Sequence, residues 1–256
     1  MIKLKSQDQI EKMKVAGRIT AGALAAASET IRPGATPLQT DAAVRKYIES
    51  HGAKPSFLGY GGFPASACIS VNDTVIHGIP DNTPYKEGDI VSVDVGAYIG
   101  GWHGDAARTF FCGNVSDEAK RLVKAAKDAF YAGMAKAVPG NRLGDICSAI
   151  EEVVVSNGFS VVREYVGHGI GMNLHEDPDV PNYGRAGRGV RLCEGMLLAI
   201  EPMINTGAAA VKVLSDEWTV KTQDGGLSAH YENTVAITAD GPVIMTLLGD
   251  EAFDSI

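Results

Sequence analysis

The stretch VSVDVGAYIGGWHGDAART, residues 91–109, predicts a β-hairpin that carries two aspartates. Its first valines alternate with other residues, which is the period-two pattern of a strand, and glycines then mark a turn. We expect the loop to be the four residues from Tyr98 to Gly101, so that Asp94 directly faces Asp105 on the second strand. Side chains that face each other across strands have Cβ atoms about 4.5–5.5 Å apart. Two carboxylates at that distance repel each other, and a strand pair that holds them there normally has a cation between them.

Two further carboxylates and one histidine lie in surroundings that suit the same site. Glu201 and Glu232 follow or precede apolar, strand-like runs, and His168 lies between two glycines that give its ring free access to a centre. Four carboxylates and one imidazole suit Mn(II), Fe(II), Co(II) or Zn(II) better than calcium or a thiolate-bound structural zinc. Four carboxylates also balance two divalent ions, and ions paired about 3.5–4 Å apart are a recurring hydrolase design.

Each candidate ligand also has a structural interpretation. Taken one at a time, an Asp or Glu beside Gly or Pro is as often a turn, cap or ion-pair residue as a ligand. The aspartate pair and the internal repeat described below favour the metal site. The remaining histidines look ordinary on sequence alone. His77 is typical of a core residue and His175 of a residue in a loop turn, whereas surface positions are expected for His51, His103 and His230. Tyr60 and Trp218 are typical of ordinary packing residues.

Composition limits the class of protein. The chain has 256 residues, of which 45% are hydrophobic and 21% charged, enough for one large domain or two small ones. A net charge of −8 without a basic run makes DNA or an anionic membrane a poor partner. Neither a signal peptide nor a span long enough for a bilayer is present, and the four scattered cysteines are typical of reduced thiols, so we expect a cytoplasmic protein. Walker A, GxSxG and HExxH motifs are absent.

Four helices are predicted from capping signals and apolar spacing. The first starts after Ser6, with Gln9 completing a capping box, and ends near Pro33-Gly34. The second is capped by Thr36, has Pro at its first position and runs to about Ser50. The third helix is expected from Ser116 to about Val138, and the fourth over Leu143–Ser156. Strands are expected at 65–71 and from residue 160 onward.

The chain also repeats itself. Pro33-Gly34 recurs as Pro139-Gly140, and residues 86–94 match residues 193–201, which makes Asp94 and Glu201 equivalent positions. We therefore expect one catalytic domain over residues 1–256 with an internal duplication, its halves covering about 8–114 and 115–256. A site on the pseudo-twofold axis would receive ligands from both halves.

In chain order, the five candidate ligands resemble those of the methionine aminopeptidases, most closely the single-domain, bacterial-like type I form. The resemblance extends over essentially the whole chain and is carried by His77-Gly78-Ile79-Pro80, by residues 93–109 and 167–178, by Glu201-Pro202 and by residues 218–234. It implies the pita-bread α+β fold, in which two pseudo-twofold-related halves surround a curved, mainly antiparallel sheet with helices on its outer face. It also implies removal of the initiator methionine from nascent proteins and peptides with a small second residue.

The resemblance further implies a role for each residue. Asp105 and Glu232 would bridge two divalent ions (Co, Mn, Fe(II) or Zn), Asp94 would hold one, and His168 with Glu201 the other. A hydroxide on the two ions would attack the first peptide carbonyl, with Glu201 accepting and returning the proton, while the free amino group would sit on the ion held by Asp94. His175 would stabilise charge on the carbonyl oxygen, and His77 would contact the substrate amide.

A methionine pocket is implied as well, lined by Tyr60, Phe63, Cys68, Leu174 and Trp218. Methionine's unbranched thioether suits an apolar slot with aromatic walls. Two positions depart from the usual pattern of the family. Phe57 stands where a small residue or Cys is common, and Leu174 where an aromatic residue is usual, which affects pocket shape and not the metal chemistry.

Three alternatives remain open at this point. An X-Pro aminopeptidase or dipeptidase shares the fold but generally carries an additional N-terminal domain. A non-enzymatic binding module on the same fold typically lacks the ligands, whereas all five are present here. A structural cation site predicts that chelation unfolds the protein. For partners, we expect a peptide with a free N-terminal Met, no DNA and no membrane, and a monomeric protein; a transient ribosome contact is left open.

Overall fold

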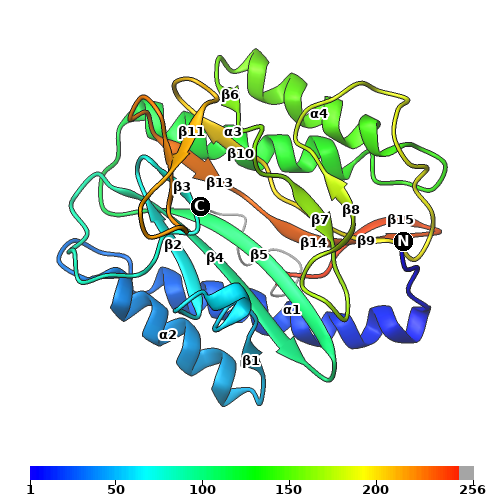
Figure 1. Ribbon diagram of the computed structural model, residues 1–256, viewed down its shortest axis with the longest axis horizontal. Coiled ribbons are helices and arrows are strands. Elements are labelled where there is room, and N and C mark those ends of the chain that lie inside the picture. Colours follow the sequence, from blue (N-terminus) through cyan, green and yellow to red (C-terminus); the bar gives the residue numbers. More distant parts are fainter. Residues whose placement is uncertain (248–256) are drawn as a thin grey trace.

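The structure is a computed structural model that describes residues 1–247, so the last nine residues of the expected domain, 248–256, lie outside the described residues. Its four α-helices within that part are α1 (Gln7–Ser28), α2 (Pro37–Ser50), α3 (Asp117–Met134) and α4 (Leu143–Ser156). In Figure 1 the pair α1–α2 lies on one side of the strands and the pair α3–α4 on the other. Over residues 1–247, no helix is long and apolar enough to cross a membrane.

The predicted helix starts are confirmed at their caps. Ser6 accepts a hydrogen bond from the backbone of Gln9, whose side chain accepts one from the backbone of Ser6, and Thr36 and Gln39 form the same capping box.

Two helices end earlier than predicted. The first ends at Ser28, because the hydroxyls of Ser28 and Thr30 donate to the carbonyls of Ala25 and Ala27 at 2.7 Å and compete with the helical backbone pattern. The third ends at Met134, not near Val138, whereas the bounds of the fourth agree with prediction.

The strands form four small sheets, and every pairing among the described residues is antiparallel. One sheet contains β1 (Lys54–Pro55), β2 (Ala67–Val71), β4 (Ile90–Ile99) and β5 (Trp102–Phe111); another has the order β15 (Gly241–Ile244), β14 (Asn233–Thr238), β9 (Leu197–Ile200), β7 (Gly167–Gly169), β8 (Glu176–Val180). The two three-stranded sheets are β13 (Ser228–His230), β10 (Met203–Asn205), β6 (Ser160–Val161) and β11 (Val211–Val213), β12 (Val220–Thr222), β3 (Thr74–Ile76).

The β4–β5 hairpin is present, but its predicted register was wrong. Ile99 pairs with Trp102, so the loop is only Gly100-Gly101, and both glycines have positive φ, 60° and 90°. A two-residue loop of this kind follows the twist of its strands, and glycine adopts the positive φ values without strain. Asp105 therefore pairs with Gly96, and Asp94 with Ala107. The two aspartates are diagonal neighbours on one face and do not face each other directly.

Each helix pair packs its own core against a sheet. Val91, Val93 and Val95 are fully buried in the cluster formed with α1 and α2, so the residues that alternate with them, Asp94 included, point to the opposite face. A second cluster joins α3 and α4 to β9, through residues such as Phe130 and Leu198. Helix α1 approaches β5 so closely that a Cβ on Gly104 would lie 2.8 Å from the backbone nitrogen of Gly17. Asp105, the next residue, is thereby held on a strand with little freedom to shift.

Candidate metal centre and adjoining cavity

The candidate ligands come from strands that meet near the middle of the molecule. Asp94 lies within β4, Asp105 within β5 and His168 within β7, while Glu201 directly follows β9 and Glu232 lies between β13 and β14. Backbone hydrogen bonds join β5 to the segment that holds Glu232: Glu232 N–H donates to Ala107 at 2.9 Å, and Ala107 N–H donates to Glu232 at 3.3 Å. The Thr234 hydroxyl adds a 2.9 Å bond to the Asp105 carbonyl. These contacts fix Asp105 relative to Glu232.

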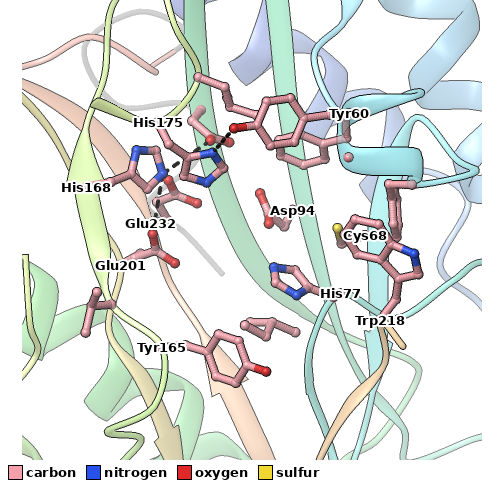
Figure 2. Close-up of a pocket in the computed structure, with 17 residues that line it drawn as sticks. Tyr60, Cys68, His77, Asp94, Tyr165, His168, His175, Glu201, Trp218 and Glu232 are labelled. Atoms are coloured by element: carbon pink, nitrogen blue, oxygen red, sulfur yellow. Dashed lines mark hydrogen bonds and ion pairs between the residues drawn. The ribbon is translucent and has the colours of Figure 1, made fainter. Parts of the chain in front are cut away.

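The side chains converge as the sequence predicted. Nε2 of His168 lies 3.8 Å from Oδ2 of Asp105 and 3.6 Å from Oε1 of Glu201. Ligand atoms of Asp105, His168 and Glu232 all lie within 4.8 Å of one another. Asp94 lines the same cavity as these groups, and its charge raises the pKa of Asp105. The five predicted ligands therefore line one cavity. Figure 2 labels four of them, Asp94, His168, Glu201 and Glu232.

Burial raises the pKa of every carboxyl group in this cluster. It raises the pKa of Asp94 to about 7 and of Glu201 to about 8. The pKa values of Asp105 and Glu232 are raised well above the ordinary range, first by burial and then by the neighbouring carboxylates. Four carboxylates so close together cannot all be ionised at neutral pH without positive charge among them.

The donor set fits divalent cations. One oxygen each of Asp94, Asp105 and Glu232 is buried without a hydrogen-bond partner, an arrangement that is costly unless an ion or water satisfies it. Burial lowers the pKa of His168 to about 3, so its imidazole is neutral. Its Nδ1 lies 2.9 Å from the Gly169 carbonyl, which can only accept, so Nδ1 carries the proton and Nε2 presents a lone pair to the carboxylates.

The structure corrects the interpretation of His230, which the sequence suggested to be a surface residue. Its relative exposure is 1%, and its Nε2 lies 3.5 Å from Oε2 of Glu201. The sequence contained a signal that His230 lies at the site. His230 precedes Glu232 by two positions, and residues two apart on an extended chain share a face. His51, by contrast, is exposed as predicted, and His103 is half-buried with Nδ1 2.9 Å from the Ser56 hydroxyl.

A cavity of about 270 Å³ adjoins the cluster, and all the residues predicted for catalysis and substrate binding line it. These are Tyr60, Phe63, Cys68, His77, Asp94, Asp105, His168, Leu174, His175, Glu201, Trp218 and Glu232. In Figure 2 Cys68 and Trp218 lie on one side of the cavity, His168 and Glu201 on the other, and Asp94 between them. His77, Tyr60 and Trp218, interpreted from sequence alone as core or packing residues, thus line the cavity, and Trp218 also packs against a core cluster. Sequence reasoning missed Ile76, Tyr165 and Val166, which also line the cavity and resemble any core residues in sequence.

The side of the cavity away from the carboxylates is apolar. Phe63, Cys68 and Leu174 are buried, and the ring of Phe63 meets the edge of Trp218 with centroids 5.2 Å apart. Burial raises the pKa of the Cys68 thiol well above its ordinary value, so this side chain stays a protonated, apolar wall. Phe57, one of the two positions that depart from the family pattern, lines the cavity together with Leu174, the other.

Two imidazoles stand at the edge of the cavity. Nδ1 of His175 lies 2.8 Å from the Tyr60 hydroxyl, and its ring is 4.2 Å from that of His168. His77 has a φ of 56°, in the left-handed region that is uncommon outside glycine, and its ring lies 5.7 Å from that of Tyr165. Strained backbone of this kind gathers at functional sites.

Comparison with known proteins gives consistent matches. Residues 11–239 match Metallopeptidase family M24. A methionine aminopeptidase of Clostridium perfringens is 54% identical over 248 residues, covering 97% of this chain and 100% of that protein. The crystal structure of methionine aminopeptidase from Rickettsia prowazekii superimposes with a TM-score of 0.95 at 42% identity, covering 96% of this chain and 100% of that one. The prolidase from Pyrococcus horikoshii shares the fold, with a TM-score of 0.78 and 24% identity, and this chain covers 64% of it. These matches confirm the predicted pita-bread fold, and the chain belongs to metallopeptidase family M24.

Proposed function

We propose that this protein is a metal-dependent methionine aminopeptidase, a hydrolase that removes the N-terminal initiator methionine from nascent proteins and peptides with a small second residue. The observation that carries the proposal is one cavity with two unlike walls, a carboxylate–imidazole cluster on one side and a buried apolar slot on the other. The C. perfringens relative, which matches over 100% of its length, supports the same activity.

Asp94, Asp105, His168, Glu201 and Glu232 would hold two divalent ions, of Co, Mn, Fe(II) or Zn. When bound, such ions act as Lewis acids and lower the pKa of a bound water to about 7. The buried, unpartnered oxygens of Asp94, Asp105 and Glu232 support this assignment.

Glu201 is the residue that would move the proton. Its carboxylate stands between two imidazoles, with Oε1 3.6 Å from His168 and Oε2 3.5 Å from His230. In this position a carboxylate oxygen of Glu201 accepts the proton from the attacking water and returns it to the amine that leaves.

His175 and His77 would act on the scissile peptide. The carbonyl oxygen of that peptide gains negative charge during attack, and a preorganised N–H donor stabilises it. In the tautomer of His175 in which Nδ1 accepts from the Tyr60 hydroxyl, the proton of the neutral imidazole lies on Nε2, which is then the donor. His77, on the opposite wall beside Tyr165, would contact the substrate amide near the scissile bond.

The apolar slot would bind the methionine side chain. A thioether makes favourable contacts with aromatic edges, which Phe63 and Trp218 provide, and Cys68 and Leu174 complete the wall. Phe57, which is buried, adds a further aromatic side chain to the lining of the cavity. The free amino group of the substrate would sit on the ion held by Asp94, and a blocked N-terminus has no lone pair to offer, which explains action at the chain end.

The proposal includes a cytoplasmic location, where nascent chains arise, and a monomeric protein; one chain supplies all five predicted ligands. A transient contact with the ribosome belongs to the same proposal. The X-Pro alternative is less favoured, because this chain is 24% identical to the prolidase and 54% identical to the C. perfringens methionine aminopeptidase.

The direct test is hydrolysis of Met-Ala-Ser against Ala-Pro by protein loaded with each metal in turn. The expected result is release of methionine from Met-Ala-Ser and no cleavage of Ala-Pro. Cleavage of Ala-Pro alone would support an X-Pro enzyme, and no turnover with any metal would support a binding module.

A further inference from the structure

His230 is a buried imidazole that the five-residue ligand set does not use. Its relative exposure is 1%, and its Nε2 has no hydrogen-bond partner. Unpaired polar atoms this deeply buried are rare in folded proteins, because each lowers stability unless an ion, water or another polar group satisfies it. The nitrogen points toward two of the candidate metal ligands, Glu201 and Glu232.

The distances around this nitrogen are those between ligands of a shared ion. Nε2 of His230 lies 3.5 Å from Oε2 of Glu201 and 3.9 Å from Oε2 of Glu232. These separations exceed the 2.7–3.2 Å of a hydrogen bond. With metal–ligand bonds of about 2.0–2.2 Å, two ligands of a tetrahedral ion are about 3.4 Å apart. Two ligands on opposite sides of an octahedral ion are about 4.2 Å apart.

His168 provides an internal comparison. Its Nε2 lies 3.6 Å from Oε1 of Glu201 and 3.8 Å from Oδ2 of Asp105. His230 thus repeats the arrangement of His168 on the other oxygen of Glu201. Ligand atoms of Glu201, His230 and Glu232 lie within 4.8 Å of one another, as do those of Asp105, His168 and Glu232.

We propose that Nε2 of His230 is a sixth metal ligand, which binds an ion together with Glu201 and Glu232. The centre then has a second nitrogen donor. The inference rests on the metal centre of the proposed function. A second imidazole makes the donor set softer, and imidazole suits Zn, Co and Fe better than Mn, which favours carboxylate, carbonyl and water oxygens. The centre should therefore prefer Zn²⁺ over Mn²⁺ through His230.

The test is isothermal titration of metal-free protein with Zn²⁺ and with Mn²⁺, for wild type, His230→Gln and His77→Gln. His77 lines the same cavity but forms no ion pair with a carboxylate among the described residues, so its variant is the matched control. For His230→Gln we expect Zn²⁺ affinity to fall at least about tenfold, more than Mn²⁺ affinity, and wild-type affinities for the control. Zn²⁺ affinity within twofold of wild type would overturn the proposal.

A second measurement needs no variant and covers the case in which His230→Gln misfolds. In ¹⁵N-histidine-labelled wild-type protein, Zn²⁺ should shift the Nε2 resonances of both His168 and His230, whereas a histidine that only positions Glu201 would keep an N–H at Nε2. A His230 signal that retains this proton in the Zn²⁺ form would overturn the proposal. Both readouts are independent of turnover, so failure of methionine release would reject the proposed function without deciding the role of His230.

Discussion

The hydroxyl of Tyr60 lies 2.8 Å from Nδ1 of His175, a residue 115 positions further along the chain. The two rings are tilted, with centroids 5.3 Å apart, at the edge of the cavity (Figure 2). Tyr60 belongs to the short 3-10 turn Tyr60–Gly62, and His175 directly precedes β8. The contact therefore joins two loops and sets which nitrogen of His175 faces the cavity.

Replacing Tyr60 with Phe should slow catalysis without unfolding the protein. One hydrogen bond of about 1 kcal/mol is lost, which corresponds to roughly a fivefold fall in kcat for Met-Ala-Ser. Tyr98→Phe is the control, because Tyr98 contacts His103 and does not line the cavity. Equal kcat values for wild type and Tyr60→Phe would show that the contact does not orient His175.

Metal removal should inactivate the protein and leave it folded. Neither of the two large cores includes any of the four carboxylates, so the fold should not depend on the ions. Chelation should abolish methionine release and leave the far-UV circular dichroism unchanged. The melting temperature should fall, because a ligand at 100 times its Kd adds about 2.7 kcal/mol to the free energy of unfolding. Loss of the helical signal on chelation would support the structural cation site instead.

Arg108 should be the most costly arginine to replace. Its Nη1 donates to the carbonyl oxygens of Ala107 and Glu232 at 2.9 and 2.6 Å, and its Nη2 donates to Asn233 at 2.8 Å. Hydrogen bonds from a charged group contribute about 1.5–3 kcal/mol, so Arg108→Met should lower the free energy of unfolding by about 3 kcal/mol in urea. Arg121→Met, which removes an exposed guanidinium near Phe159, should cost less than about 0.5 kcal/mol. Similar losses for both variants would contradict this account.

Acid should remove the contribution of the Lys5–Glu176 ion pair, in which Nζ and Oε2 are 2.7 Å apart. Burial raises the pKa of Glu176, but hydrogen bonds from Lys5 and from the backbone of Asn173 outweigh it, and the net pKa lies below the ordinary 4.5. Because the folded pKa is the lower one, the carboxylate stabilises the fold above the unfolded pKa, and that stability is lost as pH falls through the folded pKa.

The corresponding measurement is urea unfolding of wild type and Glu176→Gln between neutral and acid pH. The difference in free energy of unfolding should be largest at neutral pH and shrink below pH 4.5. Glu152→Gln, an exposed position on α4, is the control and should show little difference at any pH. A constant wild-type advantage over Glu176→Gln would argue against the ion pair as its source.

Local sequence signals predicted the helices well and the sheet register less well. Ser6 and Thr36 identified two helix starts, because a cap depends only on residues within one turn. The loop of the β4–β5 hairpin was predicted as four residues, although Gly100-Gly101 is itself a signal for a two-residue loop. The error did not move the aspartates to different faces, since the shift was by an even number of residues.

The sequence surroundings of the five candidate ligands were enough to select them, and the resemblance then implied their roles. Residues whose place at the site depends on tertiary contacts were missed. His230 looked like a surface residue because its strand is short, and its burial depends on contacts with β5, including a bond from its N–H to the Thr109 hydroxyl at 3.0 Å. Tyr165 likewise lines the cavity only because its loop folds beside His77.

The central claim, that these carboxylates hold the ions that make methionine release possible, is tested most directly by one paired measurement. Bound metal per chain and Met-Ala-Ser hydrolysis are compared for wild type, Asp105→Asn and the control Asp128→Asn, an aspartate on α3 paired with Lys124. We predict that Asp105→Asn loses bound metal and turnover together while its far-UV circular dichroism matches that of wild type, and that Asp128→Asn keeps both. An Asp105→Asn protein that still binds its metal and releases methionine at the wild-type rate would contradict the account.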